Sequence, residues 1–380
     1  MKSIDKNVIY LGWVSFFTDM ASAMVTTLLP IFVIYVLDEG IEKLGFIIAI
    51  STFVSYGLRV VFGYLSDKYQ IVKPFVVSGY LISALSKPLL MFSTSFASVA
   101  VLRALERSGK AVRSASKDSL ISGYADKKHA GKTFGFHKMM DVAGEMSGSL
   151  VIVAFFYFGI QNDELIRDIF GWTLLPGLLA VVIVMFFVAD SPKKHQSGID
   201  VVNRDDYKLF WLLGNYFLFL MFFMSEQYFI VESKASGMTL MQIPFLVIVS
   251  TLTQTLLSYY SGVFTDRFGV FFMLFLSYML GIVSTLFLWQ HYFWLSFAFL
   301  GAFSVVSLNA LRTYISLHAK SQGFVYGVFY GGIAFFSALG AVLIGRIWSV
   351  YSFEASIYFS VAGSLLMMMG LFFIKARSEI

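Results

Sequence analysis

The 380-residue chain contains no cysteine, only six prolines and few charged residues. The lack of cysteine excludes disulfide bonds, zinc–thiolate and iron–sulfur sites, and thiol catalysis. Lysine, arginine, aspartate and glutamate make up 13% of the chain, whereas soluble domains carry about 25%. A chain this poor in charge and 58% hydrophobic is expected to be a polytopic membrane protein. Its net charge of +5 does not indicate a nucleic-acid partner, because the basic residues lie in short loops and on one helix.

Sequence features of enzymes are also missing. No nucleophile–base pair, metal-ligand cluster or phosphate-binding glycine loop stands out, and no polar stretch is long enough to form an ATP-binding domain. We therefore expect no catalysis, no metal and no cofactor. The expected partner at this point is the lipid bilayer, for a multi-pass membrane protein.

Twelve segments are long and apolar enough to cross a bilayer, which takes about 20 residues of helix. They predict an all-α membrane fold. The longest polar stretch separates the sixth segment from the seventh. We expect an N-terminal six-helix bundle at 1–189, a cytoplasmic linker at 190–207 and a C-terminal six-helix bundle at 208–380. The twelve segments are 8–36, 44–65, 75–93, 97–122, 133–159, 169–189, 208–231, 240–264, 270–289, 292–317, 324–350 and 354–375.

Lysine and arginine are distributed unevenly between the two sides of this arrangement. Fifteen of them fall on the side that holds both termini and three on the other. Cytoplasmic loops carry an excess of basic residues, so both termini are expected in the cytoplasm. The three on the outer side are Lys43, Arg167 and Lys234.

The fourth segment carries seven charged residues where a membrane-spanning helix should be apolar. At 100° per residue they fall within an arc of about 140°. Charged residues inside a bilayer normally face a water-filled cavity or a partner, so we expect this face to line a solute pathway. The seven residues are Arg103, Glu106, Arg107, Lys110, Arg113, Lys117 and Asp118.

The excess of cations on this face predicts an anionic solute, because the planar guanidinium of arginine binds carboxylate or phosphate through two hydrogen bonds. We expect Arg103, Arg107 and Lys110, near mid-depth, to contact the substrate. Arg113 and Lys117 lie nearer the cytoplasm and are expected to gate the pathway or form pairs. The alternative is a closed salt-bridge network that only holds helices together.

Carboxylates on the first, fourth and fifth segments are candidates for proton coupling. A carboxylate that exchanges a nearby arginine for solvent changes its pKa and can therefore carry a proton. The candidates, in order of preference, are Asp19, Glu145 and Asp141, with Glu106 beside them. Sodium coupling stays open as an alternative.

Three further polar residues give weaker signals. Ser15 shares a polar stripe with Asp19 on the first segment. His137 lies near the cytoplasmic end of the fifth segment, where we favour solvation over a relay role. Lys87 precedes a proline in the third segment, and we expect its amine to reach the membrane surface.

The second half of the chain is far more apolar. Its candidates for substrate contact are Asn215, Glu226, Tyr259 and Asn309. Arg312, near the inner end of the tenth segment, is expected to take part in gating.

A sequence repeat links the two halves. Gly63 and Asp67 lie at the end of the second segment in GYLSDK, and Gly262 and Asp266 lie at the end of the eighth in GVFTDR, each offset by 199 residues. This loop motif, with twelve spans and a long central loop, resembles the major facilitator superfamily. Arg103 is similar to the arginine of the family's fourth helix.

The resemblance implies two six-helix bundles that rock about a midplane site. It also implies gating contacts at the cytoplasmic ends of the helices. Asp67 would lie near Gly323, and Asp266 near Lys132–Thr133.

Two runs, GKAVRSASKDSLIS (109–122) and FGFHKMMD (134–141), are further similar to a bacterial subgroup of this family with a charged fourth helix. We expect a proton-coupled symporter of a small organic anion, with a carboxylate siderophore as one fitting cargo. One alternative is a proton-driven multidrug or metabolite exporter. Another, of a different class, is a non-transporting membrane receptor or lipid-handling protein.

Overall fold

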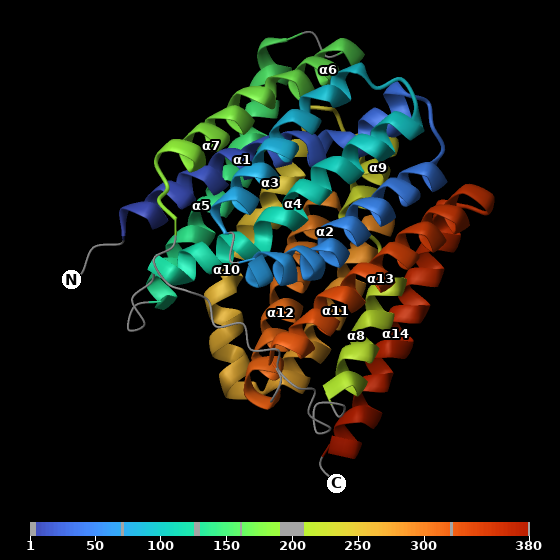
Figure 1. The fold of residues 1–380 in the computed structure, drawn as a ribbon. Helices are drawn as coiled ribbons and strands as arrows, with labels where there is room; N and C mark the ends of the chain where they lie inside the picture. The colour runs from blue at the N-terminus through green and yellow to red at the C-terminus, as the bar shows by residue number, and fades with distance from the viewer. Residues whose placement is uncertain are drawn as a thin grey trace. The chain divides into compact units, whose positions relative to one another are not determined.

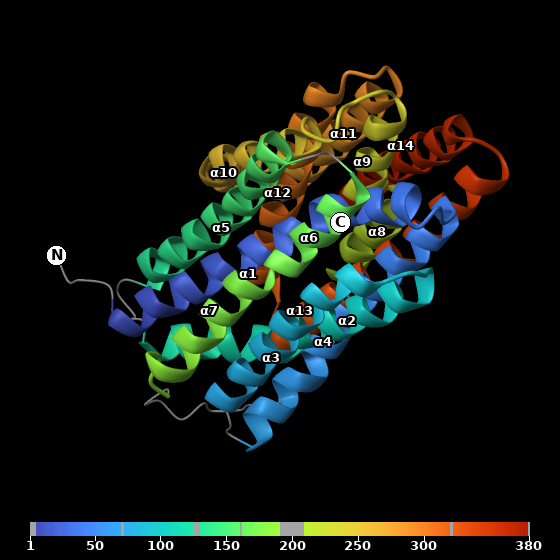
Figure 2. The same ribbon diagram turned by 90° about the horizontal axis from the view of Figure 1, so that it is seen from above.

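The computed structural model describes residues 5–69, 72–124, 130–159, 162–190, 209–319 and 322–378. Every regular element in these ranges is helical, which confirms the all-α prediction (Figures 1 and 2). The chain divides into two compact units, Met1–Glu39 with Ile50–Gly198 and Gly40–Ala49 with Ile199–Ile380. The expected linker at 190–207 lies, apart from its first residue, outside the described ranges, so the domain boundaries stay predictions.

The helices of the first unit cover the first six expected segments. The first and third segments each change helix type before they end, and the sixth is built from two helices. Helix α2 begins in the second unit and ends in the first. The elements are α1 (Lys6–Ile31), η1 (Phe32–Val36), α2 (Ile41–Tyr69), α3 (Lys73–Ser86), η2 (Pro88–Phe92), α4 (Phe96–Tyr124), α5 (Ala130–Phe158), α6 (Asp163–Trp172) and α7 (Leu174–Phe186).

The second unit covers the last six segments, and the seventh of the twelve is again built from two helices. The elements are α8 (Leu209–Phe222), α9 (Glu226–Ala235), α10 (Ile243–Phe268), α11 (Val270–Trp289), α12 (Phe293–His318), α13 (Gln322–Val350) and α14 (Phe353–Ser378).

Among the described residues, eleven helical segments are long and apolar enough to cross a membrane. Helix α4 is not among them, because its charged side chains keep its hydropathy low. The least apolar helix of the first unit is thus the one that the sequence marks as functional.

The sixth segment begins earlier than the expected residue 169. Helix α6 starts at Asp163 because the Asn162 side chain accepts a hydrogen bond of 2.9 Å from the backbone N–H of Leu165, which caps the helix. Arg167, assigned to a loop from the sequence, lies within α6 and donates to the carbonyl oxygens of Met91 and Ser93.

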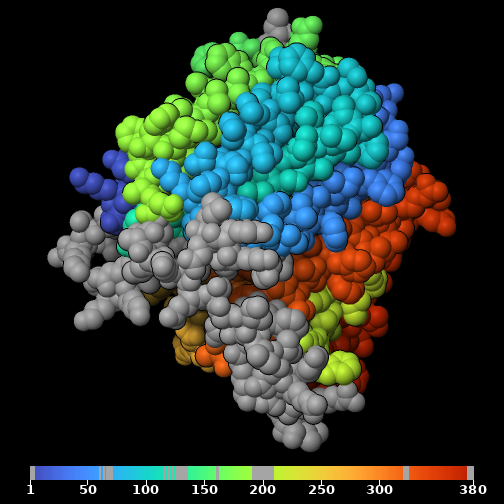
Figure 3. All heavy atoms as spheres, viewed as in Figure 1, coloured from blue at the N-terminus to red at the C-terminus, as the bar shows by residue number. Residues whose placement is uncertain are grey.

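Helix packing repeats between the two units. In the first, α1 packs against α5 and α7, and α3 packs against α4 and α7. In the second, α8 packs against α13 and α14, and α11 packs against α12 and α14. Counted as membrane segments, these are the same four pairs in each unit, as expected for two pseudo-equivalent bundles. Figure 3 shows side chains of α3, α4 and α7 packed against one another on the visible face of the first unit.

A glycine allows a close helix pair in each unit. A Cβ added to Gly144 of α5 would lie 2.2 Å from the carbonyl oxygen of Phe16 on α1. A Cβ added to Gly340 of α13 would lie 2.4 Å from the carbonyl oxygen of Met221 on α8. Both distances are shorter than a carbon–oxygen contact allows, so these helices approach backbone to backbone.

Candidate functional site

Helix α4 turns its charged face toward the interior of the first unit. The apolar side chains of Val101 and Leu105, on the other face, are exposed. In a water-soluble protein the polar face of such a helix is exposed and the apolar face is buried. The reverse arrangement found here fits a helix whose outer face contacts lipid. The Asp118 side chain lies outside the described residues. Arg103, Glu106 and Arg113 are buried, and Arg107, Lys110 and Lys117 are half-buried.

One carboxylate oxygen on α4 meets two arginines. Nη1 of Arg103 donates to Oε2 of Glu106 at 2.6 Å, and Nε of Arg107 lies 3.2 Å from the same oxygen. The other oxygen, Oε1, is buried and has no hydrogen-bond partner among the described residues. Nε and Nη2 of Arg103 are also buried without such a partner. One negative charge therefore serves two guanidiniums, whose hydrogen-bonding capacity is only partly used.

Lys87 adds a third cation to this region. It lies at the end of α3, is 1% exposed, and its Nζ donates a long hydrogen bond of 3.5 Å to the carbonyl oxygen of Thr18 on α1. The expectation that this amine reaches the membrane surface is wrong, because α1 and α4 enclose it. We call Lys87, Arg103, Glu106 and Arg107 the buried charge cluster.

Arg113 lies six residues beyond Arg107 on α4, also at the contact between α3 and α4. Its guanidinium lies 4.7 Å from the centroid of the Tyr80 ring on α3. A cation over an aromatic face is stabilised electrostatically without a counter-ion. This contact fixes Arg113 against α3.

A second polar group joins α4, α1 and α5. Nζ of Lys117 donates to Oγ of Ser15 at 3.2 Å, and Oγ of Ser15 lies 2.9 Å from Nε2 of His137. Nδ1 of the same imidazole lies 3.4 Å from Oδ1 of Asp141. We call these four residues the three-helix chain. His137 is buried, so the expectation that it is solvated is wrong.

The remaining acidic candidates border these two groups. Asp19 is half-buried on α1 and lies near enough to Lys87 and Lys110 to act on both electrostatically. Glu145 lies one turn beyond Asp141 on α5 and is exposed. The structure thus brings Asp19 and Asp141 close to the cations of the first unit.

Two candidates of the second unit are engaged in helix contacts. The Asn215 side chain of α8 donates to the carbonyl oxygen of Met367 at 3.0 Å and accepts from the Tyr278 hydroxyl at 3.0 Å. The Asn309 side chain of α12 donates to Oγ of Ser261 at 2.6 Å. Both amides join helices within the bundle.

The other candidates of the second unit lie at helix ends or on surfaces. Tyr259 is 74% exposed on α10, and Asp266 is exposed near the end of the same helix. Glu226 is half-buried in the first turn of α9. Nη2 of Arg312 donates to the hydroxyl of Tyr330 at 3.2 Å, which joins α12 to α13.

The gating contacts expected from the family resemblance stay predictions. The side chains of Asp67, Lys132 and Thr133 and the surroundings of Gly323 lie outside what the structure describes.

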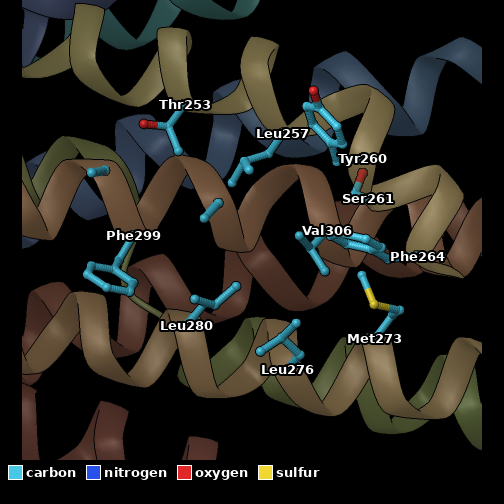
Figure 4. Close-up of a pocket in the computed structure, with 12 residues that line it drawn as sticks. Thr253, Leu257, Tyr260, Ser261, Phe264, Met273, Leu276, Leu280, Phe299 and Val306 are labelled. Carbon is cyan, nitrogen blue, oxygen red and sulfur yellow. The ribbon is translucent and has the colours of Figure 1, made fainter. Parts of the chain in front are cut away.

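A pocket of about 350 Å³ lies within the second unit, between α10, α11 and α12. Figure 4 shows aliphatic and aromatic side chains from these helices around it, among them Leu257, Leu280 and Phe299. Its lining includes no charged residue, so its chemistry suits an alkyl or aromatic group and not an anion.

In the part of the chain that the structure describes, no group of three or more histidine, aspartate or glutamate side chains could hold a metal ion. The polar sites described above consist of cations, single carboxylates and hydroxyl groups. Such sites suit the binding of a charged solute and the movement of protons.

A family model for the Major Facilitator Superfamily matches residues 11–232, more than half of the chain. The chain belongs to the major facilitator superfamily. Its members are transporters and not enzymes, and the helical segments described above agree with a multi-pass membrane protein that carries out secondary transport.

The names of two relatives describe them as uncharacterised. An MFS-type transporter of Methanocaldococcus jannaschii is 28% identical over 381 aligned positions, covering 95% of this chain and 93% of that protein. A protein of Mycobacterium tuberculosis is 27% identical over 149 positions, covering 39% of this chain and 36% of that protein. Neither name includes a substrate.

Solved structures with the same fold include transporters of different solutes. Nucleoside transporter NupG has a TM-score of 0.75 at 12% identity, with 99% of this chain and 100% of that chain covered. A D-xylose–proton symporter has a TM-score of 0.72 at 14% identity, with 95% of each chain covered. At these identities the likeness shows the fold alone.

Proposed function

We propose that this transporter moves a small organic anion across the membrane and couples that movement to protons. The observation that carries the proposal is the excess of positive charge inside the first unit. The buried charge cluster holds Lys87, Arg103 and Arg107 against Glu106 alone. Lys110 and Asp19 lie beside the cluster. Counted together with it, the region holds four cationic and two anionic side chains.

An uncompensated charge in a low-dielectric interior is costly, and partners normally neutralise it. An anion bearing one or two negative charges would neutralise this excess. The unused N–H groups of Arg103 support a ligand with several oxygens, since guanidinium donors bind carboxylate and phosphate groups in pairs.

The proposed roles of the cations in the first unit differ with the exposure of their side chains. Arg107 and Lys110 are half-buried and are proposed to contact the anion directly. Arg103 is fully buried against Glu106 and is proposed to hold the other cations in place, with its free donors turned toward the same ligand. Glu106 then serves as the fixed counter-charge, which leaves Asp19, Asp141 and Glu145 as the proton carriers.

The roles proposed for residues of the second unit also follow from the contacts that each side chain makes. Glu226 and Tyr259 stay candidates for substrate contact, whereas Asn215 and Asn309 are proposed to act through helix packing. Asp67, Asp266, Arg113, Lys117 and Arg312 stay proposed gating residues.

Carboxylate-rich solutes, including carboxylate siderophores, fit this chemistry. A multidrug exporter of lipophilic cations fits less well, because the interior charge has the wrong sign. The apolar pocket between α10, α11 and α12 is the feature that would favour a lipid-handling protein. We propose a monomer in the cell inner membrane.

Uptake into proteoliposomes tests the class of solute. Labelled citrate and glucose 6-phosphate represent carboxylate and phosphate anions, uridine and xylose represent neutral solutes, and tetraphenylphosphonium represents lipophilic cations. The proposal expects saturable uptake of at least one anion, stimulated by a pH gradient that is acidic on the entry side. Uptake of only uridine, xylose or the lipophilic cation would overturn it.

A further inference from the structure

The three-helix chain has a defined direction of hydrogen bonding. The Lys117 ammonium has donors only, so Oγ of Ser15 accepts from it. An ionised Asp141 has acceptors only, so the proton between it and the imidazole lies on Nδ1 of His137. In a neutral imidazole Nε2 is then bare, and it accepts the hydroxyl proton of Ser15. From Lys117 to Asp141 each contact thus places a donor before an acceptor, through two hydrogen bonds and then an ion-pair contact of 3.4 Å.

Charged groups of both signs surround His137. The imidazole is buried between α1, α4 and α5. Lys117 on α4 and Lys138 on α5 oppose a positive imidazolium, whereas Asp19 on α1 and Asp141 on α5 favour it. The contacts of the two ring nitrogens assign the ring the neutral form with its proton on Nδ1.

We propose that Ser15 and His137 form a proton path between Lys117 and Asp141. This inference rests on the proton coupling of the proposed function, and it gives roles to a hydroxyl and an imidazole that had none. Lys117 is the donor end of the path because its ammonium has only protons to donate, and Asp141 is the acid that the path serves.

The transfer moves one proton across each contact. Asp141 takes the proton from Nδ1 of His137, Nε2 takes the hydroxyl proton of Ser15, and Ser15 takes a proton from the Lys117 ammonium. The products are a neutral Lys117 amine, an intact Ser15 hydroxyl, a neutral His137 with its proton on Nε2, and a protonated Asp141. Lys117 has lost its positive charge by giving up a proton, and Asp141 has lost its negative charge by taking one. The imidazole has changed from one neutral tautomer to the other.

The long contact at the end of the path is consistent with a movable proton. Oδ1 of Asp141 is buried, and no described group makes a hydrogen bond with it. The 3.4 Å between Nδ1 and Oδ1 is beyond the usual range of a strong hydrogen bond. A small rotation of the imidazole would close it, so transfer to Asp141 can depend on side-chain movement.

Nitrogen-15 NMR of histidine-labelled full-length protein in lipid bilayers tests the path without any substrate. His137→Gln identifies the signals of His137 by their loss. The expected result at neutral pH is a neutral ring with a protonated Nδ1 and a bare Nε2. Ser15→Ala is expected to shift the Nε2 signal toward that of a non-bonded nitrogen, whereas Ser22→Ala, on the same helix, leaves it unchanged.

Two NMR results would overturn the proposal. One is an imidazolium, with both nitrogens protonated at neutral pH. The other is an Nε2 signal that does not respond to Ser15→Ala. His318 supplies an internal standard, because its Nδ1 lies 3.0 Å from the carbonyl oxygen of Tyr314 and must therefore carry the proton.

A transport measurement separates this inference from the proposed function. With citrate as the probe, Ser15→Ala and His137→Gln should lower accumulation driven by a pH gradient at least about tenfold and leave citrate–citrate exchange intact. Unchanged gradient-driven accumulation in both variants would overturn the path. If the wild type moves no citrate, the citrate version of the proposed function fails, and the NMR result alone decides the path.

Discussion

Arg103 and Glu106 form a fully buried ion pair on one face of α4, with 2.6 Å between Nη1 and Oε2. The same carboxylate oxygen lies 3.2 Å from Nε of Arg107. A single side chain therefore compensates two guanidiniums inside a membrane-embedded bundle.

Removal of that carboxylate should destabilise the first unit. Glu106→Gln would leave Arg103 and Arg107 without a counter-charge, and breaking a buried pair costs about 3–5 kcal/mol. We expect a marked fall in the melting temperature of the protein in detergent. Glu164→Gln, on the exposed first turn of α6, is the matched control and should melt like the wild type. Equal melting of both variants would show that the pair is not important for stability.

Removal of Lys87 should have the opposite effect on the stability of the protein. Its amine is buried with one hydrogen bond of 3.5 Å, in a region that already has an excess of cations. Replacing buried ionic groups by apolar side chains of similar volume is often neutral or stabilising by about 1–4 kcal/mol, provided that no opposite charge is left unpaired. Glu106 keeps Arg103 and Arg107 as partners when Lys87 is removed. Lys87→Met should therefore melt at or above the wild-type temperature while it weakens the binding of anions. A strong loss of stability would mean that Lys87 is paired more tightly than its contacts indicate.

The contact between α1 and α5 should be sensitive to one methyl group. Gly144→Ala would place Cβ against the carbonyl oxygen of Phe16, and overpacking of this kind costs about 1–3 kcal/mol. Gly331→Ala on α13 is the control, because no atom lies within 4 Å of its added Cβ. Alanine favours a helix by about 1 kcal/mol over glycine, so the control should be as stable as the wild type or more so. The opposite order of melting temperatures would contradict the close helix approach.

Proton coupling should depend on Asp19. Asp19→Asn cannot lose a proton, so uptake driven by a pH gradient should fall to the level without a gradient, while exchange of the same anion continues. Asp163→Asn, on the exposed first turn of α6, is the control. An unchanged response of Asp19→Asn to the gradient would eliminate Asp19 as a proton carrier.

Much of this fold could be predicted from the sequence because the bilayer requires long apolar helices. All twelve expected segments are helical in the described residues, and the sixth begins early only because Asn162 caps α6. The buried charged face of α4 could also be predicted, since its charges share one arc and a bilayer does not tolerate them outside. The pairing of Arg103 with Glu106 follows from their spacing of three residues.

Contacts between helices could not be predicted in this way. A single lysine before a proline gives no sign that α1 and α4 enclose it, so Lys87 was misplaced. The chain through Ser15 and His137 depends on how three helices are rotated about their axes, which periodicity does not determine. The available signal was that each of these residues shares a polar stripe with an acid, Asp19 on α1 and Asp141 on α5.

The central claim is that cations inside the first unit bind the transported anion. Its most direct test is initial uptake of labelled citrate and glucose 6-phosphate by proteoliposomes that contain wild type, Arg107→Gln, Lys110→Gln or Arg346→Gln, the last an exposed arginine of α13. A lost charge-assisted hydrogen bond is worth about 1.5–3 kcal/mol, so the first two variants should lose about 10- to 100-fold in uptake and the third should match the wild type. Wild-type uptake in Arg107→Gln and Lys110→Gln would contradict the claim.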